Sequence, residues 1–183
     1  MTYYGGKELA ASFRTVRSNT IQIAEEIAEE SYSFRPSPDS RSIGETLAHI
    51  ATLTGFQSYL HQNRIDSLTK VNFPEYLQKA RAEEAGLRTK AEIITALKDD
   101  RDRFVHFLES LPESALAESV GMMPGAEPPA KSRFEMLLSA KEHEMHHRGQ
   151  LMVMQRMLGM TPHLTRQMQE RMARQAAQAA PAR

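Results

Sequence analysis

Apolar side chains recur at intervals of three and four residues in four separate segments of this 183-residue chain. That spacing places the apolar residues of each segment on one face of an α-helix. The alternation of apolar and polar residues that is typical of a half-buried strand is almost absent. The pattern therefore predicts an all-α fold in which four amphipathic helices pack as a bundle.

Helix-start signals delimit three of these four segments. In each of them a Ser or Thr is followed three residues later by a Glu, which is the spacing of a capping box. These pairs are Ser42 and Glu45, Thr89 and Glu92, and Ser132 and Glu135. We expect helices over about residues 7–30, 42–64, 89–111 and 132–158.

The connections between the predicted helices differ in character. Residues 64–86 form a long crossover between the second and third helices, with a short helix expected around residues 75–84. Residues 113–131 are rich in Gly and Pro and are expected to form a loop across one end of the bundle. The sequence predicts one bundle domain over residues 1–164 and a frayed helical or disordered tail over residues 165–183.

The composition excludes several classes of function. Lys plus Arg and Asp plus Glu both total 23, so no net charge favours nucleic acid as a partner. No apolar run reaches the ~20 residues that span a bilayer, which predicts a cytoplasmic protein without membrane partners. There is no cysteine, so histidines and carboxylates are the strong metal ligands that remain.

A cluster of histidines stands in the fourth predicted helix, within the run KEHEMHHRGQ. His143 and His147 are four residues apart, so both imidazoles project from one helix face. His49 lies on the apolar face of the second predicted helix and therefore points into the same interior. Three imidazoles without polar partners in one interior would be costly to bury. A shared ion removes that cost. The sequence therefore predicts one divalent metal held by His49, His143 and His147.

Two residues flank this predicted site, Glu45 and His146. Glu45 lies one turn before His49 and is expected either to orient its ring or to interact with the helix dipole. His146 is rotated by about 100° from His147 and is expected to flank the site. The remaining histidines are expected at the surface: His61, His106 and His163.

The fourth helix also satisfies the H-E-x-x-H pattern, in which Glu144 would act as the general base of a zinc hydrolase. The further Gly and His of the longer metalloprotease motif are absent. A Glu-x-x-His pair of the di-iron type is present too, but that site needs a second copy from another helix. Glu144 is therefore a candidate catalytic residue that depends on its orientation.

Two stretches give the chain a resemblance to a known family. ETLAHIATL in the second helix and HEMHHRGQLMVMQRMLG in the fourth resemble the DinB-like family of metal-binding four-helix bundles, as does the Pro-rich entry RPSPDSRSIGETLAHI. The likeness spans most of residues 7–160. It implies a bundle with a long crossover between helices two and three, a zinc or nickel ion on the same three histidines, and a homodimer.

The resemblance also implies a class of chemistry. Some members of this superfamily are transferases or isomerases that use low-molecular-weight thiols such as bacillithiol or mycothiol, which implies a small-molecule substrate and a thiol cosubstrate. We therefore expect a metal-dependent enzyme that activates a small thiol or water for transfer to an electrophile. Two alternatives stay open: a non-catalytic interaction module that the metal stabilises, and a zincin-type hydrolase that uses Glu144.

Overall fold

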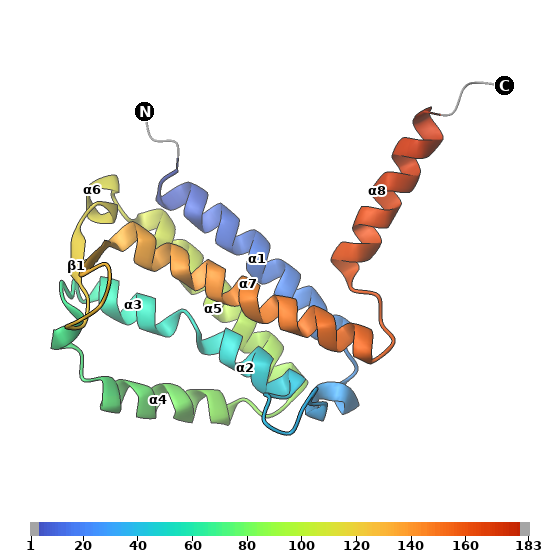
Figure 1. Ribbon diagram of the computed structural model, residues 1–183, viewed down its shortest axis with the longest axis horizontal. Coiled ribbons are helices and arrows are strands. Elements are labelled where there is room, and N and C mark those ends of the chain that lie inside the picture. The colour runs from blue at the N-terminus through green and yellow to red at the C-terminus, as the bar shows by residue number, and fades with distance from the viewer. Residues whose placement is uncertain (1–3, 180–183) are drawn as a thin grey trace.

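Helices dominate the computed structural model, which describes residues 4–179 (Figure 1). The elements in chain order are α1 (Gly6–Glu26), the 3₁₀ helix η1 (Glu29–Ser33), α2 (Ile43–Thr52), α3 (Gly55–Gln62), the 3₁₀ helix η2 (Leu68–Lys70), α4 (Phe73–Gly86), α5 (Lys90–Ser110), α6 (Glu113–Leu116), β1 (Ser119–Gly121), β2 (Ala130–Ser132), α7 (Arg133–Met157) and α8 (His163–Ala179). The mainly helical fold expected from the periodicity is confirmed.

Two apolar clusters fill the space between α1, α2, α5 and α7. One lies toward the end of α1 and includes Ile23, Ile50 and Leu151. The other lies toward the start of α1 and includes Phe13, Phe104 and Leu137. A third cluster, under α3 and the β1–β2 pair, contains Leu60, Leu68, Val71, Val120 and Met136. Burial of these side chains is the main force that holds the four long segments together.

A charged layer separates the first two apolar clusters. Arg17 of α1 is fully buried and donates to the main-chain oxygens of Ile50 in α2 and Leu97 in α5. Its guanidinium also donates to Asp100 of α5 at 2.8 Å and to both carboxylate oxygens of Glu144 in α7, at 3.0 and 2.9 Å. One side chain of α1 therefore bonds to each of α2, α5 and α7. A charged residue in an amphipathic helix normally lies on the solvated face, so the burial of Arg17 is not what its residue type suggests.

The predicted second helix is divided into α2 and α3. Thr54 stands at the break, where its hydroxyl donates to Asp100 Oδ1 at 2.5 Å. Thr52 bonds back to the main-chain oxygens of Ala48 and His49, a contact that competes with regular helix geometry. The capping boxes at the starts of α2, α5 and α7 are confirmed, because in each the Ser or Thr accepts from the main-chain N–H of the Glu.

The crossover contains a longer helix than the sequence predicts. α4 covers Phe73–Gly86 and lies along the outside of α2 and α3 (Figure 1). It contributes no buried residue, so it covers the bundle without entering the core. The Gly- and Pro-rich segment is not simply a loop, because it contains α6 and an antiparallel pair in which Val120 is opposite Lys131.

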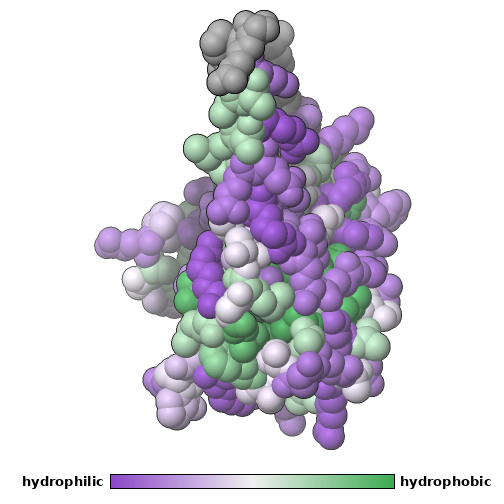
Figure 2. Space-filling model, turned by 90° about the vertical axis from the view of Figure 1, so that its right-hand side faces the viewer, coloured by the Kyte–Doolittle hydropathy of each residue, from purple (hydrophilic) through white to green (hydrophobic). Residues whose placement is uncertain are grey.

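The chain leaves the bundle after α7. α8 runs from His163 to Ala179 and projects away from the other helices, standing above a region of gathered hydrophobic residues in the end-on view (Figures 1 and 2). The predicted frayed tail is thus helical through residue 179, and residues 180–183 lie outside the described part. No helix within residues 4–179 is both long and apolar enough to cross a membrane.

Candidate metal centre

The structure brings together the three histidines that the helical spacing selects. One ring nitrogen from each of His49, His143 and His147 lies within 4.8 Å of the others. The Nε2 atoms of His143 and His147 face each other at 2.9 Å, and the ring of His49 stands 4.9 Å from that of His147 between centroids. Three imidazole nitrogens at such distances form a donor set that could hold one metal ion.

The exposure of the three side chains is graded across the site. His147 is buried, His49 is half-buried and His143 is exposed. His49 comes from α2, and the other two come from α7, so the site depends on how these two helices pack. Since one edge of the group faces solvent, a bound ion could be reached by a small molecule, as an open catalytic site requires.

Glu84 of α4 fixes the orientation of His49. Its Oε2 lies 2.9 Å from His49 Nδ1, so a neutral imidazole donates its Nδ1 proton to the carboxylate and keeps the Nε2 lone pair free. The other carboxylate oxygen lies 3.7 Å from Arg41 Nε. Glu45, which the sequence suggested for this role, instead pairs with Arg35 and accepts from the main-chain N–H of Ser42. The orienting residue is therefore Glu84.

Gln150 has the corresponding position beside His147. Its Oε1 lies 2.8 Å from His147 Nδ1, and its Nε2 lies 3.3 Å from His146 Nε2. His146 is thus held beside the group without belonging to it, as its angular position predicts. Because the Nδ1 atoms of His49 and His147 both have a polar partner, each ring can present Nε2 to a common point.

The electrostatic surroundings keep two of the three imidazoles neutral. Burial lowers the pKa of His147 to about 4, with smaller contributions from His49, His143 and His146, while Gln150 acts in the opposite direction. Burial, followed by the charges of His49 and His146, also lowers the pKa of His143. Neutral imidazoles carry the lone pair that a metal needs, so the donor set fits a divalent cation near pH 7.

Glu144 does not join the histidines. Its side chain is fully buried, and both carboxylate oxygens accept from Arg17 Nε. Burial raises its pKa, an effect that Arg17 and Thr20 oppose. It lies about 100° around the helix from His143 and faces the core, not the open edge of the site. This orientation does not support the general-base role that the H-E-x-x-H pattern suggested.

Two histidines expected at the surface are buried. His61 donates from Nε2 to Gln57 Oε1 and accepts from Arg133 at Nδ1, and burial together with the charge of Arg133 lowers its pKa to about 4. His163, at the start of α8, is 1% exposed and lies 3.2 Å from Asn19 Oδ1. His106 is exposed, as expected. Both errors occur at helix ends, where neighbouring segments fold over the side chain.

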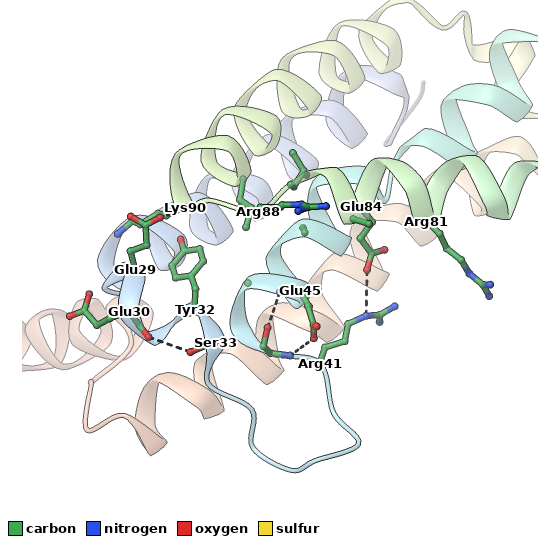
Figure 3. Close-up of a pocket in the computed structure, with 16 residues that line it drawn as sticks. Glu29, Glu30, Tyr32, Ser33, Arg41, Glu45, Arg81, Glu84, Arg88 and Lys90 are labelled. Carbon is green, nitrogen blue, oxygen red and sulfur yellow. Dashed lines mark hydrogen bonds and ion pairs between the residues drawn. The ribbon is translucent and has the colours of Figure 1, made fainter.

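Two cavities border the histidines. One of about 470 Å³ lies between α4 and the α2–α3 pair and has His49 and His143 in its wall. Another, of about 530 Å³, has His147 and Gln150 in its wall. A third cavity, of about 860 Å³, has none of the three histidines in its lining but shares Arg41, Arg81 and Glu84 with the first (Figure 3). Such volumes are typical of small-molecule sites.

Comparison with known proteins identifies the family of this chain. The family model of the DinB superfamily matches residues 12–151, a stretch that contains all three histidines of the site. The chain belongs to the DinB superfamily. The resemblance inferred from the histidine motifs is thereby confirmed.

Individual DinB relatives match along most of the chain. The uncharacterized protein YjoA of Bacillus subtilis is 28% identical over 154 residues, which is 84% of this chain and 91% of YjoA. The crystal structure of YjoA, described as a DinB-like protein, superposes with a TM-score of 0.62 over 84% of this chain and 93% of its own, at 25% identity. A DinB-like protein from Bacillus cereus gives a TM-score of 0.64 at 18% identity, covering 85% of this chain and 93% of its own, and supports the fold alone.

Proposed function

We propose that this DinB superfamily member is a divalent-metal-dependent enzyme that activates a small thiol or water for transfer to a small electrophile. The observation that carries the proposal is the convergence of one ring nitrogen each from His49, His143 and His147 within 4.8 Å. A divalent ion on three imidazoles supplies a nucleophile near neutral pH, because it lowers the pKa of a water or thiol that it binds.

The side chains around the ligands support an ordered site. Glu84 and Gln150 each contact the Nδ1 atom of one ligand, an arrangement that fixes ring orientation and raises ligand basicity. The Nε2 atoms of His143 and His147 face each other at 2.9 Å. One ion can bind both rings only when neither Nε2 carries a proton, so metal uptake is linked to pH.

The open edge favours a catalytic site over a purely structural one. A structural zinc site is closed by four protein ligands, whereas only three converge among residues 4–179 and one of them is exposed. The cavity of about 470 Å³ at that edge gives a substrate room beside the ligands. These two features support an enzyme in preference to the metal-stabilised interaction module.

Metal analysis of protein purified without nickel resin tests the site. We expect one divalent ion per chain in the parent protein and in His106→Ala, and its loss in His49→Ala and His147→Ala. Full occupancy in His49→Ala would refute the cross-helix centre. The homodimer implied by the family resemblance stays a prediction, which analytical ultracentrifugation of the same samples would test.

The reaction needs its own assay. A low-molecular-weight thiol and a reactive electrophile should form an adduct faster in the presence of the metal-loaded protein than with the chelated protein or with His49→Ala. Casein should remain intact, because Glu144 is held by Arg17 away from the open edge. Metal-dependent cleavage of casein would contradict the proposal and support a hydrolase.

A further inference from the structure

The cavity beside His49 and His143 has walls of two different kinds. One is apolar and largely aromatic: Phe56 lies 5.8 Å from Phe73 and 5.1 Å from Tyr76 between ring centroids. Leu77 is 46% exposed and also lines the cavity. An aromatic wall of this kind favours a flat, apolar ligand, because stacked and edge-to-face contacts add to the burial of apolar surface.

The other wall carries the charges. Arg41, Arg81 and Glu84 are the charged side chains among its described lining residues, so the lining has a net positive charge. Glu84 is already engaged by His49 through Oε2. Arg41 approaches Glu84 through Nε alone, and neither its two Nη groups nor the Arg81 guanidinium has a partner among the interactions found in residues 4–179. Figure 3 shows Arg41, which precedes α2, extending to Glu84 of α4, while Arg81, one turn before Glu84 on α4, extends away from that pair.

We infer that this cavity binds a small aromatic or similarly apolar carboxylic acid, whose carboxylate is held by Arg41, while Arg81 adds positive charge to the same lining. Resting on the proposed function, this inference names the substrate class of the same site. A guanidinium recognises a carboxylate through paired N–H groups, and a monoanion complements two cations and one anion. A phosphate monoester, which carries about −1.5 to −2 charges at pH 7, would exceed that balance.

The position of the charges also orients the ligand. Glu84 contacts both Arg41 and His49, at 3.7 and 2.9 Å, so the carboxylate would be held one side chain away from the proposed metal ligands. The apolar body then lies against α4 and α3, where Phe56, Tyr76 and Leu77 line the wall. Arg41 and Arg81 are positioning and specificity residues in this arrangement.

A fluorescent probe tests the inference directly. The chain contains no tryptophan, so the emission of 2-naphthoate can be followed with little protein background. We expect saturable binding below millimolar concentration in both the chelated and the zinc-loaded protein. Arg41→Gln should weaken it about tenfold or more, as should replacement of the carboxylate by a neutral hydroxymethyl group, and Arg81→Gln should weaken it by a smaller factor. Leu77→Gln should weaken both probes, because it alters the apolar wall.

Arg171→Gln is the matched control, since Arg171 is exposed on α8, outside the lining of this cavity. Three outcomes would overturn the inference. Arg171→Gln could weaken probe binding as much as Arg41→Gln, the neutral analogue could bind as tightly as 2-naphthoate, or binding could require zinc and be unaffected by both arginine changes. Zinc uptake measured on the same samples separates the two proposals. Uptake without probe binding overturns the carboxylic acid alone, whereas probe binding without uptake refutes the metal centre and supports the ligand cavity.

Discussion

Replacement of Arg17 by methionine should destabilise the protein strongly. Arg17 is fully buried and pairs with Asp100 at 2.8 Å and with Glu144 at 2.9 Å, so its loss leaves two carboxylates without their shared cation. Breaking one buried ion pair typically costs about 3–5 kcal/mol. We therefore expect Arg17→Met to lower the free energy of unfolding by about 4 kcal/mol, which corresponds to a fall in Tm of roughly 8–16 °C for a chain of this size.

Arg14→Met is the matched control on the same helix. Arg14 is 48% exposed and pairs with Glu109 at the surface, where such pairs contribute about 0.2–1 kcal/mol. Urea unfolding followed by circular dichroism, in the presence of a chelator, gives both values. A loss below about 1 kcal/mol in Arg17→Met, or an equal loss in Arg14→Met, would refute the role of the charged layer.

The pH dependence of the same pair of variants gives a second test. Buried carboxylates without a cation have raised pKa values, so folded Arg17→Met binds protons more readily than its unfolded chain. The difference in free energy of unfolding between Arg17→Met and the parent protein should therefore shrink as the pH falls from 7.5 to 5. A deficit that is constant or grows over this range would show that Asp100 and Glu144 do not depend on Arg17.

Three further predictions concern the metal and a buried histidine. Glu84→Gln should weaken zinc binding about 10- to 100-fold while Glu83→Gln, exposed on the same helix, leaves it unchanged; competition with a chromophoric chelator measures both. Saturating zinc at pH 7.5 should increase the free energy of unfolding by about 4 kcal/mol at a thousandfold excess over Kd, and should raise Tm accordingly. Chelation should leave the helical circular-dichroism signal intact at 25 °C, and complete unfolding on chelation would indicate a structural metal. Folding lowers the pKa of His61 from 6.5 to about 4. The stability that neutral His61 contributes is therefore fully present above pH 6.5 and is lost as the pH falls toward 4. The chelated parent protein should thus lose about 2 kcal/mol more than His61→Gln between pH 7.5 and 5 in urea unfolding.

The histidine group could be predicted because it depends on helical spacing. His143 and His147 share a face at any packing geometry, and the position of His49 on an apolar stripe points it inward. Glu84 could not be found in this way. It comes from a helix without buried residues, 35 residues beyond His49, so only the tertiary position of α4 brings the two together.

The charged layer has a signal in the sequence that lies in the helical spacing and not in the residue types. Arg17 is four residues from both Phe13 and Ile21, so it lies on the buried stripe of α1. Asp100 and Glu144 likewise lie on the inward faces of α5 and α7. Charges of opposite sign on the core faces of three helices indicate a buried ion-pair layer, whereas charge alone suggests a solvated face.

The absence of buried residues from α4 has a consequence for hydrogen exchange. Release of α4 would break the contacts of Glu84 with His49 and Arg41 and the contact between Tyr76 and Phe56, and would remove no fully buried side chain from the core. Such an opening costs far less than global unfolding, so the amides of α4 should exchange through local events while those of α5 exchange only through rare, cooperative ones. One wall of the cavity is then also its least protected segment. Molecules could enter beside His49 without any disturbance of the bundle that holds the other two histidines.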